Sequence, residues 1–195
     1  MNDRDPSLPH YLGVDIETTG LDERVDRILE VAAIALDADL NELDVIHYRV
    51  QCPYHVLLGM SDRVKEWHTK TGLVDLDAPD NAVPGGMSPT AVEAGLQRAL
   101  SSWFGDYAPP LLGHSVQFDR RMLAAWMPSV TALLSHRNMD ARSVENLAPD
   151  YGWPQLDGDE HTALGDVRRS IAVYREARAL LRAGIASNSN ASLLP

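Results

Sequence analysis

The stretch YLGVDIETTGL, residues 11–21, combines an apolar run with two acids and a Thr-Thr-Gly turn. The apolar run predicts a buried strand, in which side chains at positions i and i+2 point to the same face. Asp15 and Glu17 therefore share a face. Two carboxylates held there repel each other and lose hydration, which raises their pKa values or requires a counter-cation. The pair indicates half of a metal site, and capping of the turn is the alternative.

The segments after 11–21 predict a mixed α/β sheet. Apolar runs at 27–37 and 45–51 complete a three-stranded meander with the first strand. A short helix within 57–71 and a loop rich in Asp, Pro and Gly at 75–89 follow. The remaining predicted elements are strands at 111–113 and 137–140 and helices at 88–104, 117–126, 141–147 and 162–183. These elements predict a five-stranded mixed sheet flanked by helices.

Length and composition predict one globular domain. The 195 residues suffice for one core, and 45% hydrophobic content is far from that of a disordered chain. We expect a flexible leader at 1–9, the domain at 10–184 and a disordered tail at 185–195. The lone Cys52 excludes an internal disulfide and suits a reducing compartment. Because no apolar run reaches membrane-spanning length, we expect a cytoplasmic protein without a membrane partner.

The net charge restricts the nucleic acids that this chain could bind. A formal charge of −11 argues against a broad nucleic-acid-coating surface, since affinity for long duplexes comes mainly from Lys and Arg on phosphates. It does not exclude a nucleic-acid enzyme, because divalent cations in an acidic cleft reverse the local field. The charge therefore favours short substrates over long ones.

Two later motifs contribute further candidate site residues. Asp119 in GHSVQFDRRML (113–123) falls in the first turn of a helix, where an acid is also an ordinary dipole partner. In HTALGDVRRSI (161–171), His161 and Asp166 would point about 140° apart on one helix, so we expect His161 on the approach loop. Each residue alone is more simply a solvated loop or helix residue. Four acids and a histidine, each at the edge of an element, together indicate a catalytic site.

These motifs also resemble a known family. DIETTGLD, HSVQFDRR and HTALGD are similar to the three exonuclease motifs of the DEDDh 3′–5′ exonuclease superfamily, which has a ribonuclease H-like fold. Within it the chain is most similar to oligoribonuclease, through TTGLD, DRILEVA, DADLN and HRNMD. The resemblance implies hydrolysis of the 3′-terminal phosphodiester of short single-stranded RNA, with release of nucleoside 5′-monophosphates.

Oxygen ligands without a Cys/His cluster select Mg²⁺ or Mn²⁺. Four carboxylates suit two ions about 3.5–4 Å apart. The resemblance makes Asp15 the bridging ligand, with Glu17 and Asp166 beside it on the ion that binds the nucleophile. It assigns Asp119 to the leaving-group ion and His161 to the general base that accepts a proton from the attacking water.

Five further residues are candidates for substrate contacts. Leu21 matches an apolar wedge between terminal bases, and Trp67 matches a tryptophan on which a base stacks. Simple packing is the alternative for both. Ser115 matches a serine near the terminal nucleotide. Arg137 matches an arginine that holds the 5′-phosphate, and Arg142 stands where the family has a phosphate-binding serine.

Three departures from the oligoribonuclease pattern leave alternatives open. His136 replaces a tyrosine that the neighbouring subunit of the expected homodimer contributes, and the segment after Trp67 is shorter. Phe118 is more typical of DNA-proofreading relatives. One alternative is therefore a DNA exonuclease of the proofreading or repair type, acting on single-stranded DNA. The other is a catalytically silent adaptor, against which the complete set of acids argues.

Overall fold

The computed structural model describes residues 4–155 and 162–191, with a five-stranded sheet of order β3-β2-β1-β4-β5 at its centre. The strands are β1 (Tyr11–Thr18), β2 (Ile28–Leu36), β3 (Glu42–Arg49), β4 (Leu111–Gly113) and β5 (Asn138–Asp140). The first three form an antiparallel meander, and β4 and β5 continue the sheet from β1 in the parallel direction. The mixed sheet confirms the predicted α/β fold class.

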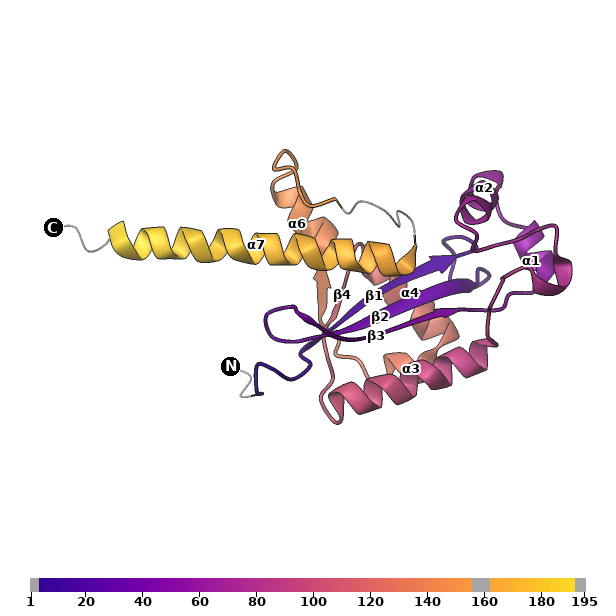
Figure 1. The fold of residues 1–195 in the computed structure, drawn as a ribbon, viewed down its shortest axis with the longest axis horizontal. Coiled ribbons are helices and arrows are strands. Elements are labelled where there is room, and N and C mark those ends of the chain that lie inside the picture. Colours follow the sequence, from indigo (N-terminus) through magenta and orange to yellow (C-terminus); the bar gives the residue numbers. More distant parts are fainter. Residues whose placement is uncertain (1–3, 156–161, 192–195) are drawn as a thin grey trace.

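Helices cover both faces of the sheet, with α7 on one face and α3 on the other (Figure 1). The helices are α1 (Tyr54–Leu58), α2 (Asp62–Lys70), the 3-10 helix η1 (Pro79–Asn81), α3 (Pro89–Phe104), α4 (Gln117–Trp126), α5 (Pro128–Thr131), α6 (Ala141–Leu147) and α7 (Ala163–Ala191). Within the described ranges, none of them is both long and apolar enough to cross a membrane.

The central strand β1 separates two cores. Leu12, Val14 and Ile16 point to one face, where they are buried in the core that α3 and α4 complete. The alternate positions of β1 point to the other face, which α7 covers. Because Asp15 and Glu17 belong to this second set, the alternation of the strand directs both acids towards α7.

The helix α7 comes very close to β1 at Gly13. A Cβ atom at this position would lie 3.0 Å from Val167 Cγ2 and 3.4 Å from Ile171 Cδ1. Both of these side chains are buried in the core beneath α7. Glycine therefore permits a close approach of helix and strand. The approach brings the first turn of α7, with Asp166, next to the acids of β1.

Two helical regions differ from their predicted bounds. The short helix predicted within 57–71 corresponds to α2, which begins where Ser61 Oγ accepts the N–H of Val64, and a separate helix, α1, precedes it. The last helix continues to Ala191, so residues 185–191 of the predicted tail are helical. Gly184 does not end α7, since one glycine in a helix costs only about 1 kcal/mol relative to alanine.

The predicted flexible leader contacts the domain from residue 4 onward. The N–H of Ala38 donates to the carbonyl of Pro6 at 3.0 Å. The guanidinium of Arg4 lies over the ring of Tyr107, 4.6 Å from its centroid. Residues 1–3, and residues 192–195 of the predicted tail, lie outside the described residues.

Candidate active site

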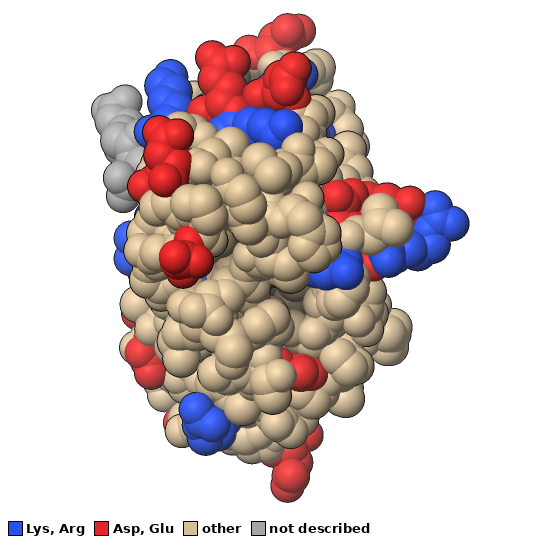
Figure 2. All heavy atoms as spheres, turned by 90° about the vertical axis from the view of Figure 1, so that its right-hand side faces the viewer, with Lys and Arg blue, Asp and Glu red and all other residues tan. Residues whose placement is uncertain are grey.

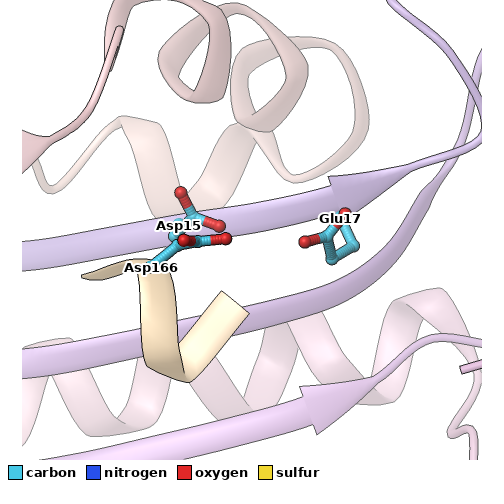
Figure 3. Close-up of side chains that lie close together, drawn as sticks. All are labelled: Asp15, Glu17 and Asp166. Atoms are coloured by element: carbon cyan, nitrogen blue, oxygen red, sulfur yellow. The ribbon is translucent and has the colours of Figure 1, made fainter. Parts of the chain in front are cut away.

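Three carboxylates from two elements meet at the end of β1 (Figure 3). Asp15 and Glu17 come from the strand, and Asp166 comes from the first turn of α7. One oxygen of each residue lies within 4.8 Å of the oxygens of the other two. In Figure 3 the carboxylates of Asp15 and Asp166 lie together, with Glu17 further along the strand. The structure thus brings together three of the four predicted metal ligands as one cluster.

The fourth acid, Asp119, approaches from α4. Its Oδ1 accepts the backbone N–H of Ile16, directly after Asp15, at 3.2 Å. Because β1 pairs with β4 at Leu12 and Gly13, the N–H of Ile16 lies beyond that pairing and requires another acceptor. Asp119 satisfies this N–H and is itself only 3% exposed. The hydrogen bond holds Asp119 beside the cluster.

Burial and mutual repulsion raise the pKa values of these acids. Burial, followed by the charges of Asp119 and Asp166, raises the pKa of Asp15 well above its ordinary range. Burial and then the charge of Asp166 raise the pKa of Glu17 to about 8. Burial raises the pKa of Asp119 to about 7, although backbone hydrogen bonds oppose the shift.

A divalent cation would restore the ionised form of such acids. Carboxylate oxygens are ligands that hard cations prefer, and the three oxygens of the cluster converge closely enough to share one ion. The residues present therefore fit a divalent metal, and the exonuclease-type site is consistent with metal dependence. The predicted general base, His161, lies outside the described residues, which resume at Thr162 immediately before α7.

The predicted base contacts lie near the end of β1. Leu21 is 78% exposed in the turn that follows the strand. Trp67 is half-buried on α2, and the next residue, His68, ties that helix to the strand. His68 Nε2 lies 2.9 Å from the carbonyl oxygen of Thr18 and donates to it, since a carbonyl can only accept. Burial lowers the pKa of His68, which favours the neutral ring.

The remaining predicted substrate contacts, Ser115, Arg137 and Arg142, are divided between the two ends of β5. Ser115, with φ of 56°, and Arg142 both donate a backbone N–H to Asp140 Oδ1 at 3.0 Å. Both residues are exposed at the end of the sheet that carries the acids. Arg137 is also exposed, but it precedes β5 at the opposite end of that strand. The structure thus places Arg142 nearer the level of the acids than Arg137.

A pocket of about 560 Å³ adjoins Arg142. Trp153 and Arg169 are among the residues that line it. Arg169 is already paired with Glu145 at 2.6 Å, so it is less available to a ligand than Arg142 is. The pocket therefore offers the exposed guanidinium group of Arg142 and the aromatic side chain of Trp153.

Sequence reasoning missed two buried polar residues that support the acids. One is His68, which is 2% exposed and ties α2 to β1. The other is Glu30, also 2% exposed, which pairs with Glu17 in the β1–β2 register. A single acid inside the otherwise apolar strand ILEVAAIAL was a signal for Glu30. For His68, the sequence contains no comparable signal.

The sheet order, together with acids from β1, α4 and α7, defines a ribonuclease H-like nuclease site. Comparison with known proteins supports this class and makes it more specific. The family model RNase_T, described as an exonuclease, matches residues 12–174. The chain belongs to this exonuclease family and is a 3′–5′ exonuclease.

Bacterial oligoribonucleases are similar to this chain over most of its length, as the sequence motifs predicted. Oligoribonuclease of Azoarcus sp. (strain BH72) is 34% identical over 182 residues, which cover 90% of this chain and 95% of the relative. Oligoribonuclease of Pseudomonas aeruginosa (strain PAO1) is 33% identical over 177 residues, which cover 87% and 94%. The resemblance to oligoribonuclease is therefore confirmed.

Solved structures share the fold. Escherichia coli exonuclease I in complex with a dT13 oligonucleotide superposes with a TM-score of 0.64 at 19% identity. The match covers 86% of this chain and 40% of that protein, so this chain spans less than half of its length. The similarity supports the fold of the domain.

Proposed function

We propose that this exonuclease removes nucleoside 5′-monophosphates from short single-stranded RNA with two Mg²⁺ or Mn²⁺ ions. The observation that carries the proposal is the convergence of Asp15, Glu17 and Asp166 within 4.8 Å, with Asp119 fixed beside them. Without a cation, Asp15, Glu17 and Asp119 have raised pKa values, and bound cations would lower them again.

The acids divide between two ion positions. Glu17 and Asp166 would hold one ion and Asp119 the other, with Asp15 shared between them. When bound, the ions would stabilise the attacking and leaving oxygens of the displacement. We assign the general base to His161, because an imidazole near neutral pH can accept the proton of the attacking water.

The distribution of charge supports a short substrate. Figure 2 shows the end of the molecule to which β1 points, where acidic and basic side chains are scattered among uncharged ones. The Lys and Arg side chains on this face, coloured blue, do not form a continuous band along which a long nucleic-acid backbone would bind. The binding energy would come instead from Leu21 and Trp67 on the terminal bases and from Arg137 and Arg142 on a 5′-phosphate.

RNA rather than DNA is proposed because the full-length relatives are named oligoribonuclease. Phe118, the residue that resembles DNA-proofreading relatives, packs against the core beneath α3. This contact gives Phe118 a role in core packing. By the same family resemblance we propose a homodimer, with His136 or Arg142 near the partner's site. A cytoplasmic location is proposed because the lone Cys52 suits a reducing compartment.

One assay tests the proposal directly. The protein is incubated with Mn²⁺ and matched 5′-phosphorylated RNA and DNA of two to twenty nucleotides. RNA of two to five nucleotides should be hydrolysed with a higher kcat/KM than a twenty-mer. EDTA should abolish the reaction, and Asp15→Asn should be inactive. Faster cleavage of single-stranded DNA twenty-mers would overturn the proposal in favour of a proofreading-type enzyme.

Two arginine variants test the phosphate contacts. Arg137→Ala and Arg142→Ala should each reduce the advantage of 5′-phosphorylated RNA over the same RNA without the phosphate. Arg168→Ala is the matched control, because Arg168 on α7 pairs with Glu42 away from the acids. An unchanged advantage in both variants would exclude Arg137 and Arg142 as phosphate contacts.

A further inference from the structure

Glu30 is a buried carboxylate on β2 that does not belong to the metal-binding cluster. It is 2% exposed, in a strand whose other residues are apolar. In the register of β1 and β2 it lies opposite Glu17. A buried charge is tolerated only when other groups compensate it. The partners of Glu30 therefore indicate what it does.

Three groups from two other elements satisfy Glu30. The backbone N–H of Ala163, the first residue of α7, donates to Oε2 at 2.9 Å. On the other oxygen, His47 Nε2 lies 2.9 Å away and Arg49 Nε lies 3.7 Å away, both from β3. Burial raises the pKa of Glu30, but its contacts with His47, Ala163 and Arg49 outweigh burial and lower the pKa overall. The carboxylate is thus contacted on both oxygens, and the lowered pKa favours its ionised form.

The contact with Ala163 has a consequence for α7. The first N–H groups of a helix have no acceptor within the helix and need one from elsewhere. Glu30 supplies such an acceptor from the sheet, as an N-cap side chain usually does from the chain just before the helix. Asp166 lies in the same first turn, and its N–H donates to the carbonyl of Thr162 at 3.0 Å. Glu30 therefore fixes the turn that carries Asp166.

Gly13 and Glu30 set two different properties of the helix. Gly13 determines how closely α7 approaches the sheet, because a Cβ there would meet Val167. Glu30 determines where the first turn begins relative to the strands. The separation of Asp166 from Asp15 and Glu17 depends on both.

We propose that Glu30 is a positioning residue, which holds the first turn of α7 so that Asp166 meets Asp15 and Glu17 on one metal ion. This inference rests on the proposed metal-binding role of those three acids. Residues that orient metal ligands typically change metal affinity about 10–100-fold when they are mutated. The effect of Glu30 should therefore appear in metal affinity, measured apart from catalysis.

Two conservative variants distinguish the effect of the position of the Glu30 carboxylate from the effect of its charge. Glu30→Asp keeps the charge but shortens the side chain by one methylene, so that it no longer reaches Ala163. Glu30→Gln removes the charge but keeps an acceptor of the same length. Glu42→Gln is the control, because Glu42 pairs with Arg168 of α7 at 3.1 Å without touching the first residue of the helix.

Calorimetry of the metal-free proteins with Mn²⁺ measures the affinity. Glu30→Asp should weaken binding by about tenfold or more. Glu30→Gln should weaken it less, and Glu42→Gln should stay within twofold of the wild type. Hydrogen exchange of the first turn of α7, without metal, should be faster in Glu30→Asp. A larger loss for Glu30→Gln than for Glu30→Asp would show a charge effect and overturn the proposal.

A double-mutant cycle provides the second criterion. In an Asp166→Asn background, Glu30→Asp should cause little further loss of Mn²⁺ affinity, because the ligand that it positions is already gone. In an Asp119→Asn background its full effect should remain, since Asp119 is held by α4. Equal losses in both backgrounds, or a lower melting temperature with unchanged affinity, would reduce Glu30 to a structural role.

The same experiments distinguish failure of this inference from failure of the proposed function. A wild-type protein that binds Mn²⁺ but degrades no RNA would overturn the proposed substrate and leave the role of Glu30 open to the affinity measurement. A wild-type protein that binds no Mn²⁺ would overturn both.

Discussion

Alternate residues of β1 point to opposite faces of the sheet, and the two faces have completely different surroundings. On the face towards α3, Leu12, Val14 and Ile16 are at most 6% exposed in an apolar core. On the face towards α7, Asp15 and Glu17 are crowded among other acids. The first face gains stability from burial, whereas the second holds carboxylates in a state that is unfavourable without a cation. Mutations of neighbouring residues in this strand should therefore have different effects: those on the acidic face should reduce activity, and those on the apolar face should reduce stability.

The largest effect is expected on the acidic face. Asp15→Asn should nearly abolish hydrolysis, because it removes the ligand that both ions would share. Its free energy of unfolding without metal should be unchanged or higher, since one repelling charge is gone. Activity with saturating Mn²⁺ and chemical denaturation measure the two properties. Near-wild-type activity would remove Asp15 from the site.

His161→Ala should have the next largest effect. Loss of a general base typically costs about 10²–10⁴-fold in rate. Affinity for Mn²⁺ should be little changed, because His161 is a proposed proton acceptor and not a ligand. Rate measurements and calorimetry on the same preparation test both statements. Loss of metal affinity would instead make His161 a ligand.

On the apolar face the expected effect is on stability. Leu12 is 1% exposed, and Leu12→Ala should lower the free energy of unfolding by about 2–5 kcal/mol. The kcat of the folded fraction should remain close to that of the wild type, because the side chain points away from the acids. Denaturant titration and an assay well below the melting temperature measure the two properties. A large fall in kcat would show that the faces of β1 are not independent.

The features that could be predicted from sequence are those fixed by local patterns. The acids lie within local motifs, and the alternation of a strand or the first turn of a helix fixes their direction. The predicted bounds 111–113 and 117–126 match β4 and α4, so Asp119 lies in the first turn of a helix, as predicted. Such features depend on neighbours a few residues away, which a single sequence shows.

The supporting contacts could not be predicted because they join distant parts of the chain. Glu30 and Ala163 are 133 residues apart, and His68 and Thr18 are 50 apart. No local pattern indicates which helix N-terminus a buried strand acid will meet. The continuation of α7 past Gly184 was missed for a different reason, since the small cost of one glycine gives only a weak stop signal.

The fourth prediction concerns the pH dependence of stability in the absence of metal. The pKa of Glu17 is about 8 in the folded protein, against an ordinary value of 4.5. Between these values the folded state binds more protons than the unfolded state. The free energy of unfolding should therefore fall as pH rises from about 4.5 to 8.

Variants from each face sharpen this last prediction. Glu17→Gln cannot lose the proton, so its stability in EDTA should fall less steeply between pH 5 and pH 8 than that of the wild type. Asp15 and Asp119 also have raised pKa values and should preserve part of the slope. Leu12→Ala should lower the whole curve while keeping it parallel to the wild type, because no titrating group is removed. A Glu17→Gln curve parallel to the wild type would show that the pKa of Glu17 is not raised in the folded protein. This result would remove one reason to expect a cation at this end of β1.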